Sequence, residues 1–295
     1  MHPKRNSLLS ALWQRIVDAS LHDRGAAGRA IIGLAVALTL TLCFAPPAKA
    51  QIVRDSVSTG NGGNMNVPSL TWPHTVGAGS NRLLIVGISF RDGNVMANAV
   101  TYGGTALTLI GAQTGPGSQN RTEMWRLLAP ASGTANIVVT MSAAKQIVTG
   151  GISFTGVNQT TPLGTFASAQ GMTGTATVTA TSATNELVLD TVTANGDANS
   201  VTPAPAQTQR WNLSSLSPPS GGNSIGGGST ELGAASVMTT WALNTAKPWS
   251  IGAISIKPAT PTAVKLSDFT ASAFNDGVML EWRSGFEANN LGYQL

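Results

Sequence analysis

The stretch Arg82-Leu83-Leu84-Ile85-Val86-Gly87-Ile88-Ser89-Phe90 decides the fold class. Aliphatic residues occupy both alternating faces of this run, which is typical of a strand covered on two sides and not of an amphipathic helix. Such a strand belongs in the middle of a sheet, with an apolar layer above it and another below. The run therefore predicts a central β-strand in a layered β protein.

Similar short runs, separated by Gly, Asn and Pro, continue through residues 51–257. The sequence Tyr102-Gly103-Gly104-Thr105 is suited to a tight hairpin turn between two of them. Many short strands at close spacing predict an all-β fold, a β-sandwich of the jelly-roll type. The other strands are predicted over 99–102, 106–112, 122–128, 135–141, 146–154, 176–180, 186–194, 235–243 and 249–257.

The positions of glycine indicate where strands approach a neighbouring sheet and where long loops occur. The phrase Gly-Ile-Ser-Phe occurs at 87–90 and 151–154, with a looser echo at 252–256. The unequal spacing predicts no tandem repeat, and the glycines instead suggest strands that closely approach a neighbouring sheet. Residues 195–206 and 214–230 are rich in Gly, Ser, Pro and Asn, so we expect long loops there, including Gly226-Gly227-Gly228.

The first 50 residues resemble an export signal. They contain six basic and two acidic side chains, then an apolar run over 30–45, then Ala48-Lys49-Ala50. This order is that of a secretory signal peptide with a small-x-small cleavage site. We expect cleavage after Ala50, a secreted or cell-surface protein, and no membrane span after cleavage, because the apolar run is shorter than the ~20 residues needed.

Charge and cysteine usage exclude several functions. The whole chain of 295 residues has a net charge of +4, but residues 51–295 hold eleven basic and eleven acidic side chains. A mature protein of this balance has no basic footprint for nucleic acid. The single cysteine, Cys43, lies in the leader, so the mature chain has no disulfides, thiolate ligands or cysteine nucleophile.

The end of the chain resembles a known family. A Pro-rich linker is predicted at 258–262, and strands follow on either side of Asn275-Asp276-Gly277. The sequence Val278-Met279-Leu280-Glu281-Trp282-Arg283, then Glu287, Asn289-Asn290 and Leu291-Gly292-Tyr293, resembles the opening of fibronectin type III-like modules of secreted bacterial proteins. The resemblance implies that 263–295 begin such a module. Residues 52–257 in turn resemble an uncharacterised bacterial β-sandwich module that stands at the front of such multidomain exported proteins.

Catalytic candidates are few. A glycosidase needs two carboxylates across a cleft, and Glu123 and Asp190 lie in strand patterns that could bring them together. The simpler interpretation pairs Glu123 with Arg121 or Arg126 and places Asp190 in a hydrogen bond near a strand end. His74, the only histidine of the mature chain, is expected at a turn or rim. A polysaccharide hydrolase or lyase is thus the alternative function.

Two segments of the sequence are candidate calcium sites. Asp92 and Asn94 flank Gly93, and Asp197 lies in an Asn-Gly-Asp-Ala-Asn turn, so both segments offer oxygen ligands. The same residue types dominate ordinary turns. The sequence indicates no other cofactor.

A binding surface for sugars would combine aromatic faces with amide and guanidinium groups. Trp211 stands beside Gln209 and Arg210, and Trp72 and Tyr102 lie near predicted strand ends. The favoured hypothesis is a non-catalytic extracellular module that binds polysaccharide or cell-surface glycans, or an adhesion or spacer module. A structural subunit of an extracellular assembly is a further alternative, and the sequence sets no oligomeric state.

Overall fold

The structure is a computed structural model that describes residues 51–195, 201–216, 223–260, 265–274 and 277–286. The chain divides into a compact unit, Ala50–Thr260, and a second unit that holds a C-terminal hairpin. The signal peptide predicted over 1–50 lies outside the described residues. Within the described ranges, no helix is long and apolar enough to cross a membrane.

The prediction of an all-β fold is confirmed, since every paired strand is antiparallel and, among the described residues, the one short helical element is a 3₁₀ turn, η1 (Pro116–Ser118). All ten predicted strands are present within a few residues. The strands of the first half of Ala50–Thr260 are β1 (Val53–Asn61), β2 (Val67–Val76), β3 (Leu83–Phe90), β4 (Ala97–Tyr102), β5 (Thr105–Ala106), β6 (Thr108–Thr114), β7 (Arg121–Leu128), β8 (Gly133–Lys145) and β9 (Ile147–Thr155). Those of the second half are β10 (Ala167–Gly171), β11 (Thr175–Thr181), β12 (Leu187–Asn195), β13 (Val201–Pro203), β14 (Thr208–Ser214), β15 (Ser224–Leu232), β16 (Ser236–Leu243) and β17 (Trp249–Ile256).

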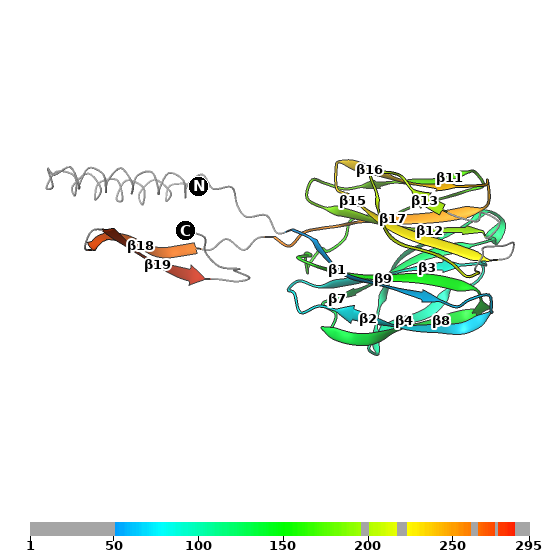
Figure 1. Cartoon of the computed structure of the whole chain (residues 1–295), viewed down its shortest axis with the longest axis horizontal. Coiled ribbons are helices and arrows are strands. Elements are labelled where there is room, and N and C mark those ends of the chain that lie inside the picture. Colours follow the sequence, from blue (N-terminus) through cyan, green and yellow to red (C-terminus); the bar gives the residue numbers. More distant parts are fainter. Residues whose placement is uncertain (1–50, 196–200, 217–222, 261–264, 275–276, 287–295) are drawn as a thin grey trace, which may run out of the picture. The chain divides into compact units, whose positions relative to one another are not determined.

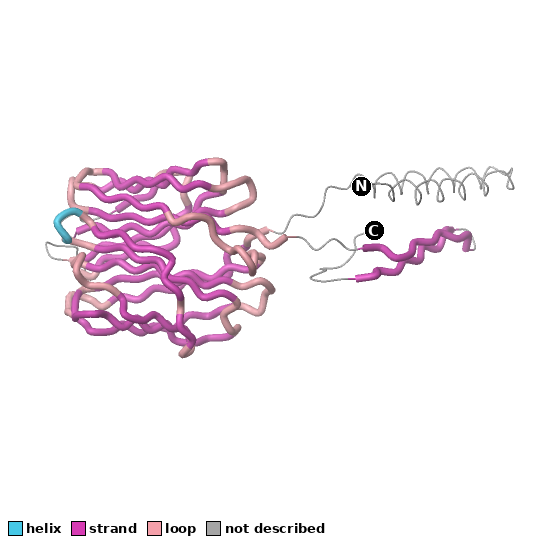
Figure 2. The backbone as a smooth tube through the Cα atoms, turned by 180° about the vertical axis from the view of Figure 1, so that it is seen from behind, coloured by secondary structure: helices cyan, strands magenta, loops and turns pink. Residues whose placement is uncertain are grey.

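In the Ala50–Thr260 unit, four sheets lie on top of one another (Figures 1 and 2). The N-outer sheet has the order β2-β8-β4-β5 and covers the N-inner sheet, β1-β9-β3-β7-β6. The C-inner sheet, β10-β17-β12-β15-β14, packs on the other face of the N-inner sheet and is covered by the C-outer sheet, β11-β16-β13. Three separate apolar clusters fill the three spaces between the sheets.

The central strand β3 shows why its sequence is apolar throughout. Leu84, Val86 and Ile88 point into the cluster beneath the N-outer sheet, while Leu83 and Ile85 point into the cluster between the two inner sheets. All eight residues of the strand are buried. The expectation of a strand covered on both sides is confirmed.

The two halves repeat one topology. In sheet order, β1, β9, β3, β7 and β6 correspond to β10, β17, β12, β15 and β14, and β2, β8 and β4 correspond to β11, β16 and β13. Register agrees as well, because Leu83 faces Leu128 and Phe154 while Leu187 faces Leu232 and Ile256. The expectation of no tandem repeat is therefore wrong at the level of structure.

Local geometry supports this equivalence. Asn81 and Asn185, which precede the corresponding strands β3 and β12, both have positive φ, of 57° and 74°. The trace of this repeat in the sequence is the looser similarity to Gly252–Ile256. This segment of β17 corresponds to Gly150–Phe154 of β9, and the two share Gly, Ile and Ser at equivalent positions. The closer match at 87–90 and 151–154 instead joins two neighbouring strands of the same sheet.

The strand β15 corrects the loop expected over 214–230. Gly226, Gly227 and Gly228 lie in the middle of this buried strand, which pairs with both β12 and β14. Side chains of other strands occupy the space that β-carbons would need: Ser89 at Gly226, Trp241 at Gly227 and the Trp211 ring at Gly228. Glycine is there for close approach of neighbouring groups, as was expected for the other glycines of the inner strands.

Residues 258–260 belong to the first unit. Val157 forms a bridge with Pro258, and the Ala259 N–H donates to the Gly156 carbonyl at 2.7 Å. The first residues of the predicted linker are therefore part of the first unit. In the second unit, β18 (Lys265–Phe274) and β19 (Gly277–Phe286) form an antiparallel hairpin with Phe274 facing Gly277. Two strands around the predicted turn agree with the sequence pattern.

Candidate functional site

Glu123 and Asp190 do not form a catalytic pair. Glu123 of β7 lies on the side of its strand that faces the N-outer sheet, beside Trp125. Asp190 of β12 lies on the side that faces the C-outer sheet, where it bonds Trp241. Both inner sheets lie between the two carboxylates, and both carboxylates are buried, so the pairing across a sheet that the sequence left open does not occur.

Glu123 is held by an ion pair, as the simpler interpretation expected. The Arg121 Nε lies 2.6 Å from Glu123 Oε1, and the indole N–H of Trp125 donates to Oε2 at 2.9 Å. The carboxylate is 1% exposed and has no access to a ligand. Its role is to satisfy buried donors at the edge of the core.

Asp190 is a fully buried carboxylate in the middle of β12 rather than near a strand end. Its oxygens accept hydrogen bonds from the Ser229 N–H at 3.0 Å, the Ser229 hydroxyl at 2.7 Å, the Gln207 amide at 2.9 Å and the Trp241 indole at 3.0 Å. Burial raises the pKa of Asp190 to about 6, and the bonds from Ser229 and Trp241 oppose that rise. The group holds the C-inner and C-outer sheets together.

The three aromatic candidates are core residues, which contradicts the expectation that they present faces to a sugar. Trp211, Trp72 and Tyr102 are 3%, 5% and 3% exposed. The Trp72 indole donates to the Ser58 hydroxyl at 3.0 Å, and the Tyr102 hydroxyl donates to the Gly133 carbonyl at 2.8 Å. Of the proposed sugar-binding residues, only Gln209 is exposed; Arg210 is half-buried, and its Nε donates to the Thr230 hydroxyl at 2.7 Å.

His74 lies in the core between β1 and β2, not at a turn or rim. Its Nδ1 is 2.8 Å from the Ser58 hydroxyl and its Nε2 is 3.3 Å from the Ser56 hydroxyl. Asp55 instead accepts bonds from the Ser153 hydroxyl and the Gly77 N–H. Burial lowers the pKa of His74 to about 4, with Asp55 opposing that shift, so the imidazole is neutral at pH 7.

This pKa predicts a loss of stability in acid. Below pH 6.5 the unfolded chain binds a proton at His74 that the folded protein does not take up until about pH 4. The advantage of wild type over His74→Gln in free energy of unfolding should therefore shrink by about 3 kcal/mol from pH 7 to pH 4. Denaturant titrations of both proteins at each pH measure it, and a constant difference would contradict the shift.

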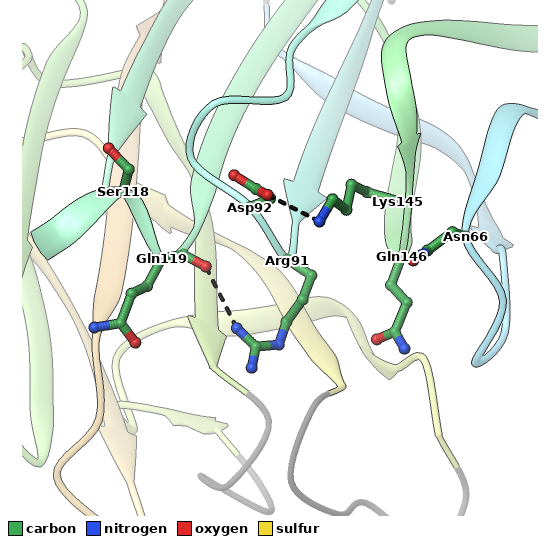
Figure 3. Close-up of a pocket in the computed structure, with 7 residues that line it drawn as sticks. All are labelled: Asn66, Arg91, Asp92, Ser118, Gln119, Lys145 and Gln146. Atoms are coloured by element: carbon green, nitrogen blue, oxygen red, sulfur yellow. Dashed lines mark hydrogen bonds and ion pairs between the residues drawn. The ribbon is translucent and has the colours of Figure 1, made fainter.

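A pocket of about 350 Å³ opens at one end of the N-terminal half (Figure 3). We call it the loop-end pocket. Its lining comes from the connections between β1 and β2, β3 and β4, β6 and β7, and β8 and β9, and from Lys145 at the end of β8. The lining residues, all polar, are Asn66, Arg91, Asp92, Ser118, Gln119, Lys145 and Gln146.

Backbone contacts hold these connections in place. The Arg91 N–H donates to the Gln146 carbonyl at 3.2 Å, which joins the end of β3 to the end of β8. The Gly93 N–H donates to the Ser118 carbonyl at 2.9 Å, which joins the same loop to η1. The Gln146 side chain donates to the Asn64 carbonyl at 3.1 Å and so ties in the β1–β2 connection.

The charges of the loop-end pocket favour an ion pair over calcium. Lys145 Nζ lies 3.0 Å from Asp92 Oδ2, and Asp92 Oδ1 accepts the Asn94 N–H at 2.9 Å. The Asn94 bond first, and Lys145 as well, lower the pKa of Asp92. Across the described residues, no three His, Cys, Asp or Glu side chains gather as metal ligands. Asp92 and Asn94 thus form a turn, and Asp197 lies outside the described residues.

Comparisons of the chain with models of protein families, with curated proteins and with solved structures find no match. The loop-end pocket offers amide and hydroxyl groups, two cations and one carboxylate, and none of its seven lining residues is aromatic. Such a lining recognises a polar ligand by hydrogen bonds and charge, not by stacking.

Proposed function

We propose that the Ala50–Thr260 unit is a secreted, non-catalytic module that binds saccharide through the loop-end pocket. The observation that carries the proposal is this open pocket of polar side chains at the end of a sandwich, where loops commonly form binding sites. Its volume is at the low end of the roughly 300–1,000 Å³ of small-molecule sites, enough for part of a larger glycan.

The chemistry of the lining supports binding without turnover. Asn66, Gln119 and Gln146 provide both donors and acceptors, which is what a ring of hydroxyl groups requires. Among the described lining residues, Asp92 is the only carboxylate, and it is paired with Lys145, whereas glycoside hydrolysis requires two carboxyl groups.

The same proposal places the protein outside the cytoplasm. The mature chain would begin at Gln51, after the predicted signal, and the β18–β19 hairpin would open a fibronectin type III-like module. In such an arrangement the sandwich would present its pocket to polysaccharide or to cell-surface glycans.

Glycan binding by the chain from Gln51 onward tests the proposal. We expect retention of the protein on a subset of an oligosaccharide array, and at least a ten-fold loss of affinity in Asn66→Ala/Lys145→Ala, because both side chains line the pocket and are not in the apolar core. Gln209→Ala is the matched control, since Gln209 is exposed on β14 and does not line the pocket. Equal binding by the double variant, or no retained glycan, would refute the proposal.

A further inference from the structure

The loop-end pocket lies in the first half of the unit, but side chains of the second half contact its lining. The Ser215 hydroxyl, directly after β14, donates to Gln146 Oε1 at 3.0 Å. The Asn195 side chain, at the end of β12, donates to Gln119 Oε1 at 3.0 Å. Both glutamines of the lining are therefore bonded by side chains of the second half.

Ser215 is held in place by Ser224, the first residue of β15. The Ser215 N–H donates to the Ser224 carbonyl at 2.9 Å, and the Ser215 hydroxyl oxygen accepts the Ser224 N–H at 2.9 Å. Ser215 is only 4% exposed, so water does not compete for these bonds. Its hydroxyl proton, which is directed at Gln146, consequently comes from a fixed point.

The partners of the Gln146 amide determine its orientation. The Asn64 carbonyl can only accept a hydrogen bond, so the amide nitrogen must face it, and Nε2 donates to it at 3.1 Å. The amide oxygen then faces Ser215. An amide nitrogen has two N–H groups, and among the described residues no acceptor takes the second one. In Figure 3 this amide lies apart from the Asp92–Lys145 pair, so a ligand can bond it while that pair stays intact.

We infer that Ser215 is a positioning residue of the loop-end pocket, because it fixes the Gln146 amide so that an N–H donor is presented to the ligand. The matching group of the glycan is an acceptor, such as the oxygen of a hydroxyl, of the sugar ring or of an acetamido group. This inference rests on the proposed function and deepens it, since binding at a site in the first half then depends on the second half.

A double-mutant cycle on the oligosaccharide array tests the role of Ser215. Wild type, Ser215→Ala, Gln146→Ala and the double variant, each from Gln51 onward, are applied to the array over a range of protein concentrations. We expect Ser215→Ala to weaken retention on the glycans that bind wild type by about five-fold, because the Gln146 amide loses the bond that fixes its oxygen. In the Gln146→Ala background the same replacement should have no further effect, since the group that Ser215 positions is absent.

Ser168→Ala is the matched control for Ser215→Ala. The Ser168 hydroxyl also donates from the second half to a glutamine of the first, Gln113 Oε1, at 2.7 Å, but neither residue lines the pocket. Its retention should equal that of wild type, and melting temperatures check that each variant is folded. Unchanged retention of Ser215→Ala would overturn the inference. An equal loss with and without Gln146 would overturn it too, because Ser215 would then act through the fold in general.

A measurement without a ligand separates this inference from the proposed function. The side-chain amide signal of Gln146 in a nitrogen–proton correlation NMR spectrum is identified by its absence from Gln146→Ala. In Ser215→Ala this signal should move toward that of a solvent-exposed glutamine. An unchanged signal overturns the positioning role even where glycans bind. A shifted signal with no retained glycan overturns the proposed function, while the orientation of the amide by Ser215 stands.

Discussion

Replacement of Trp211 with alanine is expected to lower the free energy of unfolding by about 3–5 kcal/mol. The indole lies between the two inner sheets and is 3% exposed. It fills the space above Gly87 and Gly150 of the N-terminal half and beside Gly228 of its own sheet. Since these glycines have no side chains to move into the gap, the cavity cannot close easily. Urea unfolding followed by circular dichroism measures the loss.

Leu232→Ala is the control for the Trp211 experiment. Its side chain is 81% exposed, so its truncation should change the free energy of unfolding by less than about 0.5 kcal/mol. Glycan binding by Trp211→Ala, measured where the variant remains folded, should equal that of wild type because the loop-end pocket is not altered. If the Trp211→Ala protein is stable but fails to bind glycan, Trp211 is a ligand-binding residue and not only a core residue.

Asp190 should make the protein more stable as the pH falls from 7 to 4. Its pKa is about 6 in the folded state against 3.8 in the reference state, so the folded protein binds a proton first. The stabilisation is fully present below pH 3.8 and is lost as the pH rises through 6. Relative to Asp190→Asn, which does not titrate, wild type should gain up to about 3 kcal/mol on acidification. Urea titrations of both proteins at pH 7, 6, 5 and 4 measure this gain.

The effects of Asp190 and His74 on stability have opposite signs in the same pH range. Wild type alone can therefore show an almost flat profile, and each variant exposes the contribution of the other residue. In His74→Gln the stability should rise with acid, and in Asp190→Asn it should fall. A difference between wild type and Asp190→Asn that is the same at every pH would show that the carboxylate is not perturbed by burial.

Sequence periodicity predicted the strands that are apolar and missed those that are not. The runs around Leu83–Phe90 and 249–257 mark central strands directly. Strands β1 and β2 were not predicted because polar residues, among them Ser56, Ser58 and His74, point inward and form hydrogen bonds with one another. An alternation of polar and apolar residues cannot reveal a strand whose inward face is itself polar.

The site was predicted poorly for a related reason. A register shift between Gln209 and Trp211 in the pairing of β14 with β15 alters the regular alternation, so a tryptophan flanked by polar residues lies inside. The loop-end pocket joins residues as distant in sequence as Asn66 and Gln146. Of its lining, only Asp92 was singled out from the sequence, because the other polar side chains have no spacing that marks them.

The junction of the two halves has a consequence for how such a chain could arise. Gly156, with φ of 71°, connects them, and a side chain there would overlap the carbonyl of Gln51. Its own carbonyl accepts the N–H of Ala259, so the start of the first half, its end and the end of the second half meet at one point. A duplicated gene segment encoding a single sandwich could thus be fused head to tail in frame without any added spacer.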